Sequence, residues 1–129
     1  DVVWLKNLKI VGAFEVEGTT SIYSGLLRMS DLSLALENFL FPLYIAVPNE
    51  RVKEVQEQLS RLTFQSLGLH ERCRFFTFEQ LIKEAEPMMR YAKDVNAIDQ
   101  ISQQVGGIDE EGFWQRLKCG WRVVVSRGK

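Results

Sequence analysis

The sequence predicts an α/β fold in which a mixed central sheet is flanked by helices. Three observations predict this class: short β-prone runs separated by turn residues, a change to helical spacing of apolar residues after Gly18, and an apolar run closed by prolines. In chain order the predicted elements alternate as ββαβαβα. Such alternation is typical of a sheet that carries helices on its faces.

The composition is that of an ordinary globular protein. The chain has 129 residues, of which 46% are hydrophobic and 26% are charged, and its formal net charge is −1. This length suits one domain. The two cysteines lie far apart with no CxxC motif, which argues against a zinc site and favours a reduced, cytoplasmic compartment. No apolar run reaches membrane-spanning length, so we expect no membrane partner.

The first two predicted elements form a hairpin. Asp1–Leu5 is β-prone, Lys6–Lys9 makes a turn, and Ile10–Glu17 resumes as a strand with β-branched and aromatic residues. A turn near Asn7 gives pairing partners whose residue numbers sum to about 14 to 16. Asp1 is then expected opposite the segment that ends at Glu15.

An amphipathic helix is predicted to follow from Thr20, because apolar residues recur every three or four positions. Its N-cap candidates are Thr19, Thr20 and Ser21. The apolar positions of this helix are Ile22, Leu26, Met29, Leu32, Leu36 and Phe39.

The middle of the chain predicts a buried parallel strand at Pro42–Pro48, because this apolar run is bounded by prolines. Asn49 is the expected cap of a second helix. The apolar face of that helix carries Val52, Val55, Leu59 and Leu62.

The remaining elements are predicted from shorter signals. Pro87 is expected to end one helix or to start the next, which has an apolar stripe that reaches Ile98. We expect the order strand Cys73–Phe78, helix Phe78–Glu86, helical stripe Met88, Ala92, Val95 and Ile98, loops at Gly106–Gly107 and Asp109–Gly112, and strand Trp121–Val125.

Two carboxylates of the second strand are the most informative feature. Glu15 and Glu17 are two residues apart, so they project from the same face of the strand, and the hairpin adds Asp1 beside them. Like charges this close are unfavourable unless something neutralises them. A divalent cation would do so, because it prefers oxygen ligands; a solvated strand face is the alternative.

An acid on one strand, followed by Glu-x-Glu on the next and then by a helix, resembles the core of the PD-(D/E)xK nuclease superfamily. The resemblance covers about the first half of the chain. It implies a restriction-endonuclease-like core at roughly residues 1–78, with a helical and strand extension at 79–129. It also implies a chain start that lacks the first elements of that core, so we expect a C-terminal portion of a longer protein.

Carried over residue by residue, the resemblance makes Asp1 and Glu15 the metal-binding acids. Glu17 stands where the superfamily pattern has lysine, which puts the positioning of the attacking water in doubt, although some restriction enzymes of the superfamily carry glutamate there. Arg28 and Ser24, one helical turn apart, match residues that contact the scissile phosphate. The implied cofactor is Mg²⁺ or Mn²⁺, and the implied partner is DNA, with a homodimer as a further implication.

Plainer interpretations stand beside this assignment. Arg28 and Asp31 are three residues apart on one helix and could form a surface ion pair. His70 is expected to be an ordinary residue of a surface loop. The second helix mixes acids with basic residues and predicts a solvated face, and the late aromatic residues predict core positions. These basic residues are Arg51, Lys53 and Arg61, and the aromatic residues are Phe113, Trp114 and Trp121.

Three functional hypotheses follow. The first is a divalent-metal-dependent DNA nuclease of a restriction or repair system, with Asp1, Glu15 and Glu17 as its catalytic residues. The second is a nuclease-like module without catalysis that binds DNA or protein. The third is an interaction domain whose acids are surface residues.

Overall fold

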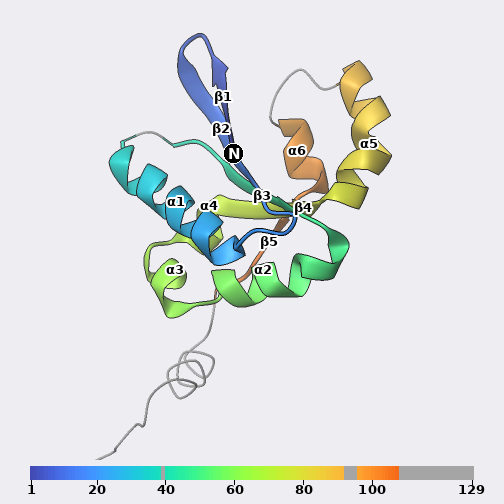
Figure 1. Ribbon diagram of the computed structural model, residues 1–129. Coiled ribbons are helices and arrows are strands. Elements are labelled where there is room, and N and C mark those ends of the chain that lie inside the picture. The colour runs from blue at the N-terminus through green and yellow to red at the C-terminus, as the bar shows by residue number, and fades with distance from the viewer. Residues whose placement is uncertain (39, 92–95, 108–129) are drawn as a thin grey trace, which may run out of the picture.

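The computed structural model describes residues 1–38, 40–91 and 96–107. It has an α/β architecture, as predicted (Figure 1). The elements are β1 (Val2–Lys6), β2 (Lys9–Val16), α1 (Ile22–Ala35), β3 (Leu43–Val47), the 3₁₀ turn η1 (Asn49–Arg51), α2 (Val52–Leu59), α3 (Leu62–Ser66), α4 (Leu69–Arg72), β4 (Cys73–Thr77), α5 (Phe78–Tyr91), α6 (Asn96–Ile101) and β5 (Gln103–Gln104).

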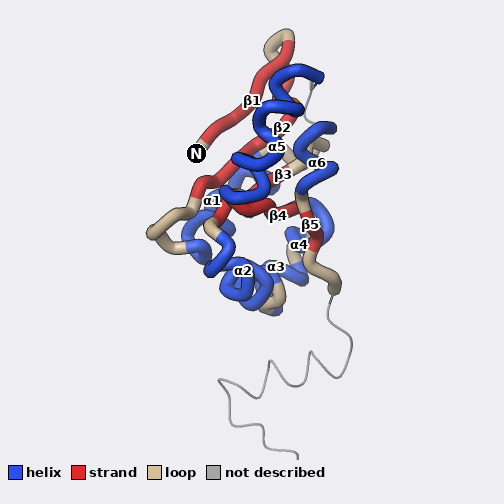
Figure 2. Tube along the Cα trace, turned by 90° about the vertical axis from the view of Figure 1, so that its right-hand side faces the viewer, coloured by secondary structure: helices blue, strands red, loops and turns tan. Residues whose placement is uncertain are grey.

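The described strands form one sheet in the order β1-β2-β3-β4-β5. The β1–β2 and β4–β5 pairs are antiparallel, whereas β2, β3 and β4 run parallel, so the sheet is mixed. Figures 1 and 2 show helices on both sides of the sheet. None of the described helices is long and apolar enough to span a membrane.

The larger core lies on the face of the sheet that α1 to α4 cover. All five residues of β3 are buried, which confirms the prediction of a buried parallel strand. Leu43, Ile45 and Val47 point toward this core, because alternate residues of a strand share a face. They pack there with Ile22 and Leu26 of α1.

The smaller core lies on the opposite face and is aromatic. Tyr44 and Phe76 pack there against residues of α5 and α6, and the Phe14 ring stacks on Tyr44 with centroids 5.0 Å apart. The Tyr44 hydroxyl donates to Oδ1 of Asp99 on α6 over 2.6 Å. Burial, followed by this hydrogen bond, raises the pKa of Tyr44 well above its ordinary value.

The β1–β2 hairpin has the predicted register. Val2 pairs with Phe14 and Lys6 with Lys9, so the partner numbers sum to 16 near the base and to 15 at the tip. The change occurs at a bulge, because Trp4 pairs with Gly12 but Leu5 pairs with Ile10. Such a bulge bends the hairpin and increases its twist.

Several local predictions need correction. Asn49 does not cap the second helix through its side chain; it opens η1, and its backbone N–H donates to Glu79 over 3.1 Å. Pro87 lies inside α5, which continues to Tyr91. That helix tolerates the missing N–H of proline. An ion pair between Glu86 and Arg90, with 2.7 Å between Oε1 and Nη2, links the residues on either side of Pro87.

Of the helical stripe predicted from Met88 to Ile98, Met88 lies in α5 and Ile98 lies in α6, whereas Ala92 and Val95 lie outside the described residues. The first long helix ends at Ala35, before the predicted Phe39. His70 lies in α4 with its side chain only 13% exposed, so the prediction of a surface loop is wrong. The predicted strand Trp121–Val125, the loop Asp109–Gly112, Phe113 and Trp114 lie outside the described residues.

Candidate metal and phosphate site

The predicted acids meet at the base of the hairpin. Asp1, Glu15 and Glu17 each offer a carboxylate oxygen, and these oxygens all lie within 4.8 Å of one another. β1 and β2 bring Asp1 beside Glu15 through their antiparallel pairing, and Glu17 follows on the same face of β2. The geometry therefore assembles a three-carboxylate cluster, which we call the acid cluster.

The acid cluster is not a solvated strand face. Glu17 is 1% exposed and Glu15 is 7% exposed, whereas Val16 between them is half-exposed on the other side of the strand. A buried carboxylate is unfavourable unless it is hydrogen-bonded or paired with a positive charge. The surface interpretation of these two acids is therefore wrong.

Arg28 of α1 supplies that positive charge. Its Nε donates to Oε1 of Glu15 over 3.1 Å, and its Nη2 donates to Oε2 of Glu15 over 2.6 Å and to Oε1 of Glu17 over 3.0 Å. Nε also lies 3.6 Å from Oδ2 of Asp1. The hydrogen bond to Glu15 is the main cause that raises the pKa of the Arg28 guanidinium above its ordinary value.

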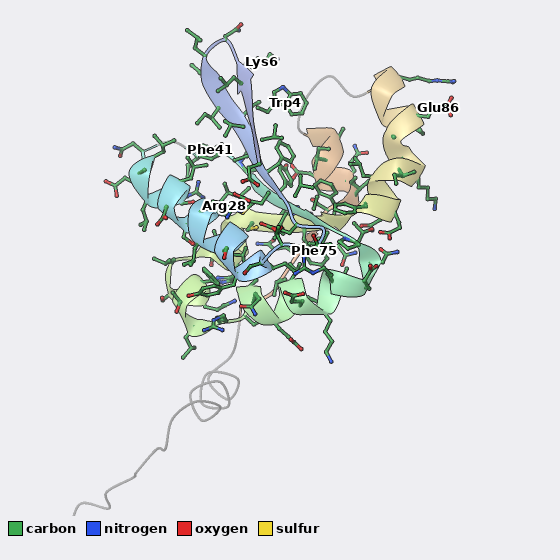
Figure 3. The ribbon with its side chains drawn as sticks, viewed as in Figure 1. Trp4, Lys6, Arg28, Phe41, Phe75 and Glu86 are labelled. Atoms are coloured by element: carbon green, nitrogen blue, oxygen red, sulfur yellow. The ribbon has the colours of Figure 1, made fainter. Side chains whose placement is uncertain are left out.

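Arg28 therefore pairs with the acid cluster. The alternative interpretation, in which Arg28 pairs with Asp31, is wrong. The Arg28 side chain remains 49% exposed, so part of the guanidinium faces solvent. Figure 3 shows Arg28 on α1 beside the base of the hairpin. Counted by formal charge, three carboxylates and one guanidinium give the cluster two negative charges in excess.

The side chain and the backbone of Glu17 are both fixed by neighbouring elements. Its Oε2 accepts a hydrogen bond from Oγ1 of Thr20, and its backbone N–H donates to the carbonyl of Ala46 over 2.9 Å. A β-carbon added at Gly25 would lie 2.5 Å from Oε1 of Glu17. Only glycine at this point of α1 lets the helix pass so close to the buried carboxylate.

The turn after β2 is fixed by Arg51, which the sequence placed on a solvated face. Its side chain is 17% exposed, and its Nη1 donates to the carbonyls of Glu17 over 3.0 Å and Gly18 over 3.2 Å. Glu54 orients the guanidinium through two hydrogen bonds of 3.0 and 2.9 Å. Arg51 is thus a positioning residue for the backbone that carries Glu17.

Of the other predicted residues near the site, Ser21 is the N-cap of α1 and its Oγ accepts from the backbone N–H of Ser24 over 3.2 Å. This confirms one of the three cap candidates. Ser24 lies one turn before Arg28, as expected. Within the residues that the structure describes, no hydrogen bond joins its hydroxyl to the acid cluster.

A cavity of about 120 Å³ opens beside the acid cluster. It is lined by Asp1, Glu15 and Arg28 together with apolar residues of β1, β2 and α1. Its volume is several times what one water molecule needs. Glu17 does not line this cavity, so a ligand there would meet Asp1 and Glu15 first.

The donor set of the cluster fits a hard divalent cation, because it consists of three carboxylate oxygens that lie close together, two of them from residues that line the cavity. The two negative charges in excess also match the charge of such an ion. Binding requires that the Arg28 side chain release some of its hydrogen bonds, which its exposure allows.

Residues 1–105 match the family described as the type II restriction enzyme NmeDI C-terminal domain. No curated protein and no solved structure gave a significant match. The matched range contains the hairpin, the acid cluster, Arg28 and every strand of the described sheet. The chain therefore belongs to the type II restriction enzyme NmeDI C-terminal domain family.

Proposed function

We propose that this chain is the metal-dependent nuclease domain of a restriction system and that it hydrolyses phosphodiester bonds of DNA. The observation that carries the proposal is the convergence of Asp1, Glu15 and Glu17, with Arg28 among them, in a family named for a restriction enzyme. The proposal includes a restriction-endonuclease-like core and membership in the PD-(D/E)xK superfamily with an E-x-E variant of its motif.

Asp1 and Glu15 would hold Mg²⁺ or Mn²⁺, since both line the cavity. When bound, such an ion lowers the pKa of a coordinated water and offsets negative charge on a phosphoryl oxygen. Glu17 is buried, so its carboxylate would contribute negative charge next to the ion or orient Arg28 by a hydrogen bond. Arg28 can form a bidentate contact with a phosphate once it leaves the carboxylates, and Ser24 would lie one turn away from that contact.

The test is cleavage of labelled duplex DNA by the full chain in Mg²⁺ or Mn²⁺, beside isothermal titration of the metal alone. Glu15→Gln keeps the size of the side chain and removes its charge, so both cleavage and metal binding should be lost. Asp31→Asn is the matched control, because Asp31 is an exposed acid of α1. It should leave both measurements unchanged.

A second candidate function is a nuclease-like module that binds DNA or protein without cutting. It is favoured by one observation: Arg28 already supplies a positive charge to Glu15 and Glu17, which a bound ion would otherwise supply. This candidate would be established by a well-folded chain that binds duplex DNA but does not cut it and does not bind Mg²⁺ or Mn²⁺. A chain that binds neither metal nor DNA would refute the nuclease and the DNA-binding form of the second candidate.

A further inference from the structure

The tip of the β1–β2 hairpin combines three locally unfavourable features. Asn7 and Leu8 form its two-residue turn, with φ of 51° and 64°. Positive φ at both turn positions is usual for tight hairpins, but asparagine and glycine are the residues that adopt it easily. Leucine is strained in this left-handed region, because its Cβ crowds the backbone.

The second feature is exposure of that same residue. Leu8 is 95% exposed, more than any other large hydrophobic residue among those the structure describes. Figures 1 and 3 show that the hairpin tip projects away from the sheet and α1, with Lys6 near its end. A strained leucine in full contact with water has no structural benefit within the described fold.

The third feature is a pair of like charges. Lys6 and Lys9 are direct partners in the register of the hairpin, and like charges in this position repel each other. Within residues 1–38, 40–91 and 96–107, no carboxylate lies within ion-pair distance of either lysine. A polyanion would neutralise both charges, and an apolar surface between its charges would cover Leu8.

We propose that this tip is a DNA-binding element in which Lys6 and Lys9 contact phosphates and Leu8 enters a groove against the bases. The inference rests on the proposed function, because the same two strands carry the acid cluster at their other end. Lysines on a duplex backbone with an apolar side chain in the groove form a known mode of nucleic-acid binding.

The hairpin also sets the distance between the two contacts. Lys9 and Glu15 are six residues apart on β2, which corresponds to about 20 Å of strand. One base-pair step is about 3.4 Å, so for a duplex that lies along the hairpin the tip is roughly six steps from the acid cluster. The tip therefore contacts phosphates and bases of the DNA on one side of the cleavage position.

The experiment measures binding of a labelled pool of random-sequence duplexes by the full chain in EDTA, together with thermal unfolding. Leu8→Gly relieves the strain of the turn, so the melting temperature should stay or rise while the affinity falls about fivefold. Because the melting temperature should not fall, loss of folding cannot explain loss of binding.

A double variant, Lys6→Gln with Lys9→Gln, tests the charges. Affinity should fall at least tenfold at low salt, and the slope of log affinity against log salt should decrease by nearly two, since about 0.9 is expected per phosphate contact. Lys83→Gln on the exposed surface of α5 removes one lysine elsewhere and should change little.

If the wild-type chain binds duplex DNA and the tip variants bind equally well, this inference is wrong while the proposed function stands. If the wild-type chain binds no duplex in EDTA, this inference is wrong, and cleavage in Mg²⁺ or Mn²⁺ decides the proposed function separately. If the tip variants instead lose binding to phosphatidylserine vesicles and not to DNA, the tip contacts membranes, which also overturns the inference.

Discussion

The two ends of the β1–β2 hairpin each hold a pair of like charges, but only one end contains the opposite charge. At the base, Glu15 and Glu17 are buried and share the guanidinium of Arg28. At the tip, Lys6 and Lys9 face each other in the register of the strands, and the described residues offer them no acid. One pair is thus compensated within the fold, and the other is open to an outside partner.

This difference indicates what each pair does for the protein. Buried carboxylates without a counter-charge destabilise the folded chain, so Arg28 contributes to the stability of the base. Exposed lysines are solvated and weaken the hairpin only slightly. The charges at the base are therefore tied to folding, whereas those at the tip are available for binding.

The largest effect is expected from Arg28→Ala, which leaves two buried carboxylates without their counter-charge. We expect a loss of about 3 kcal/mol in the free energy of unfolding, measured by urea denaturation. Mg²⁺ or Mn²⁺ should restore much of it, because an ion that binds only the folded chain stabilises by about 2.7 kcal/mol at one hundred times its dissociation constant.

Arg90→Ala is the matched control for that variant. Arg90 pairs with Glu86 on the exposed surface of α5, so its loss should cost less than about 0.5 kcal/mol and no metal should rescue it. If Arg28→Ala were as stable as the wild type, the acid cluster would not depend on Arg28, and the contrast between the two ends of the hairpin would disappear.

A smaller effect is expected from Gly25→Ala, which places a β-carbon against Glu17. The contact of 2.5 Å to Oε1, with the rest of that side chain also close, forces Glu17 or α1 to move. We expect a loss of about 2 kcal/mol by thermal unfolding. Gly106→Ala is the control, because nothing lies within 4 Å of a β-carbon there; equal stability of both variants would contradict the close packing.

The smallest effect is expected from Lys9→Glu, which gives the tip an internal counter-charge. Its carboxylate would lie opposite Lys6, so the hairpin should gain about 0.5 kcal/mol in the free energy of unfolding at low salt. Raising the salt concentration should remove this gain. A variant less stable than the wild type at low salt would show that the two lysines do not repel each other.

Much of this arrangement was predictable from the sequence. The period of two placed Glu15 and Glu17 on one face, and the turn near Asn7 gave the register that brings Asp1 to them. Long periodic segments such as α1 and the buried run of β3 were also found. These predictions succeeded because local spacing decides which face of an element each residue occupies.

The parts that failed depend on contacts distant in sequence. Arg51 bonds to carbonyls more than thirty residues earlier, and no local pattern distinguishes it from the solvated Lys53 two positions later. The burial of Glu17 and the requirement for Gly25 arise only when α1 packs against β2. β5 was missed because its two glutamines carry no β-propensity.

The bulge between the pairs Trp4–Gly12 and Leu5–Ile10 divides the hairpin into a base that carries the acids and an arm that carries the tip. Adding two residues to each strand on the tip side would lengthen the arm by about 6.6 Å, keep the tip side chains on their faces and leave the acids in place. That increment is close to two base-pair steps. Under the two proposals above, small insertions in the arm would change the distance between the tip and the acid cluster in homologous domains and leave the acids unchanged.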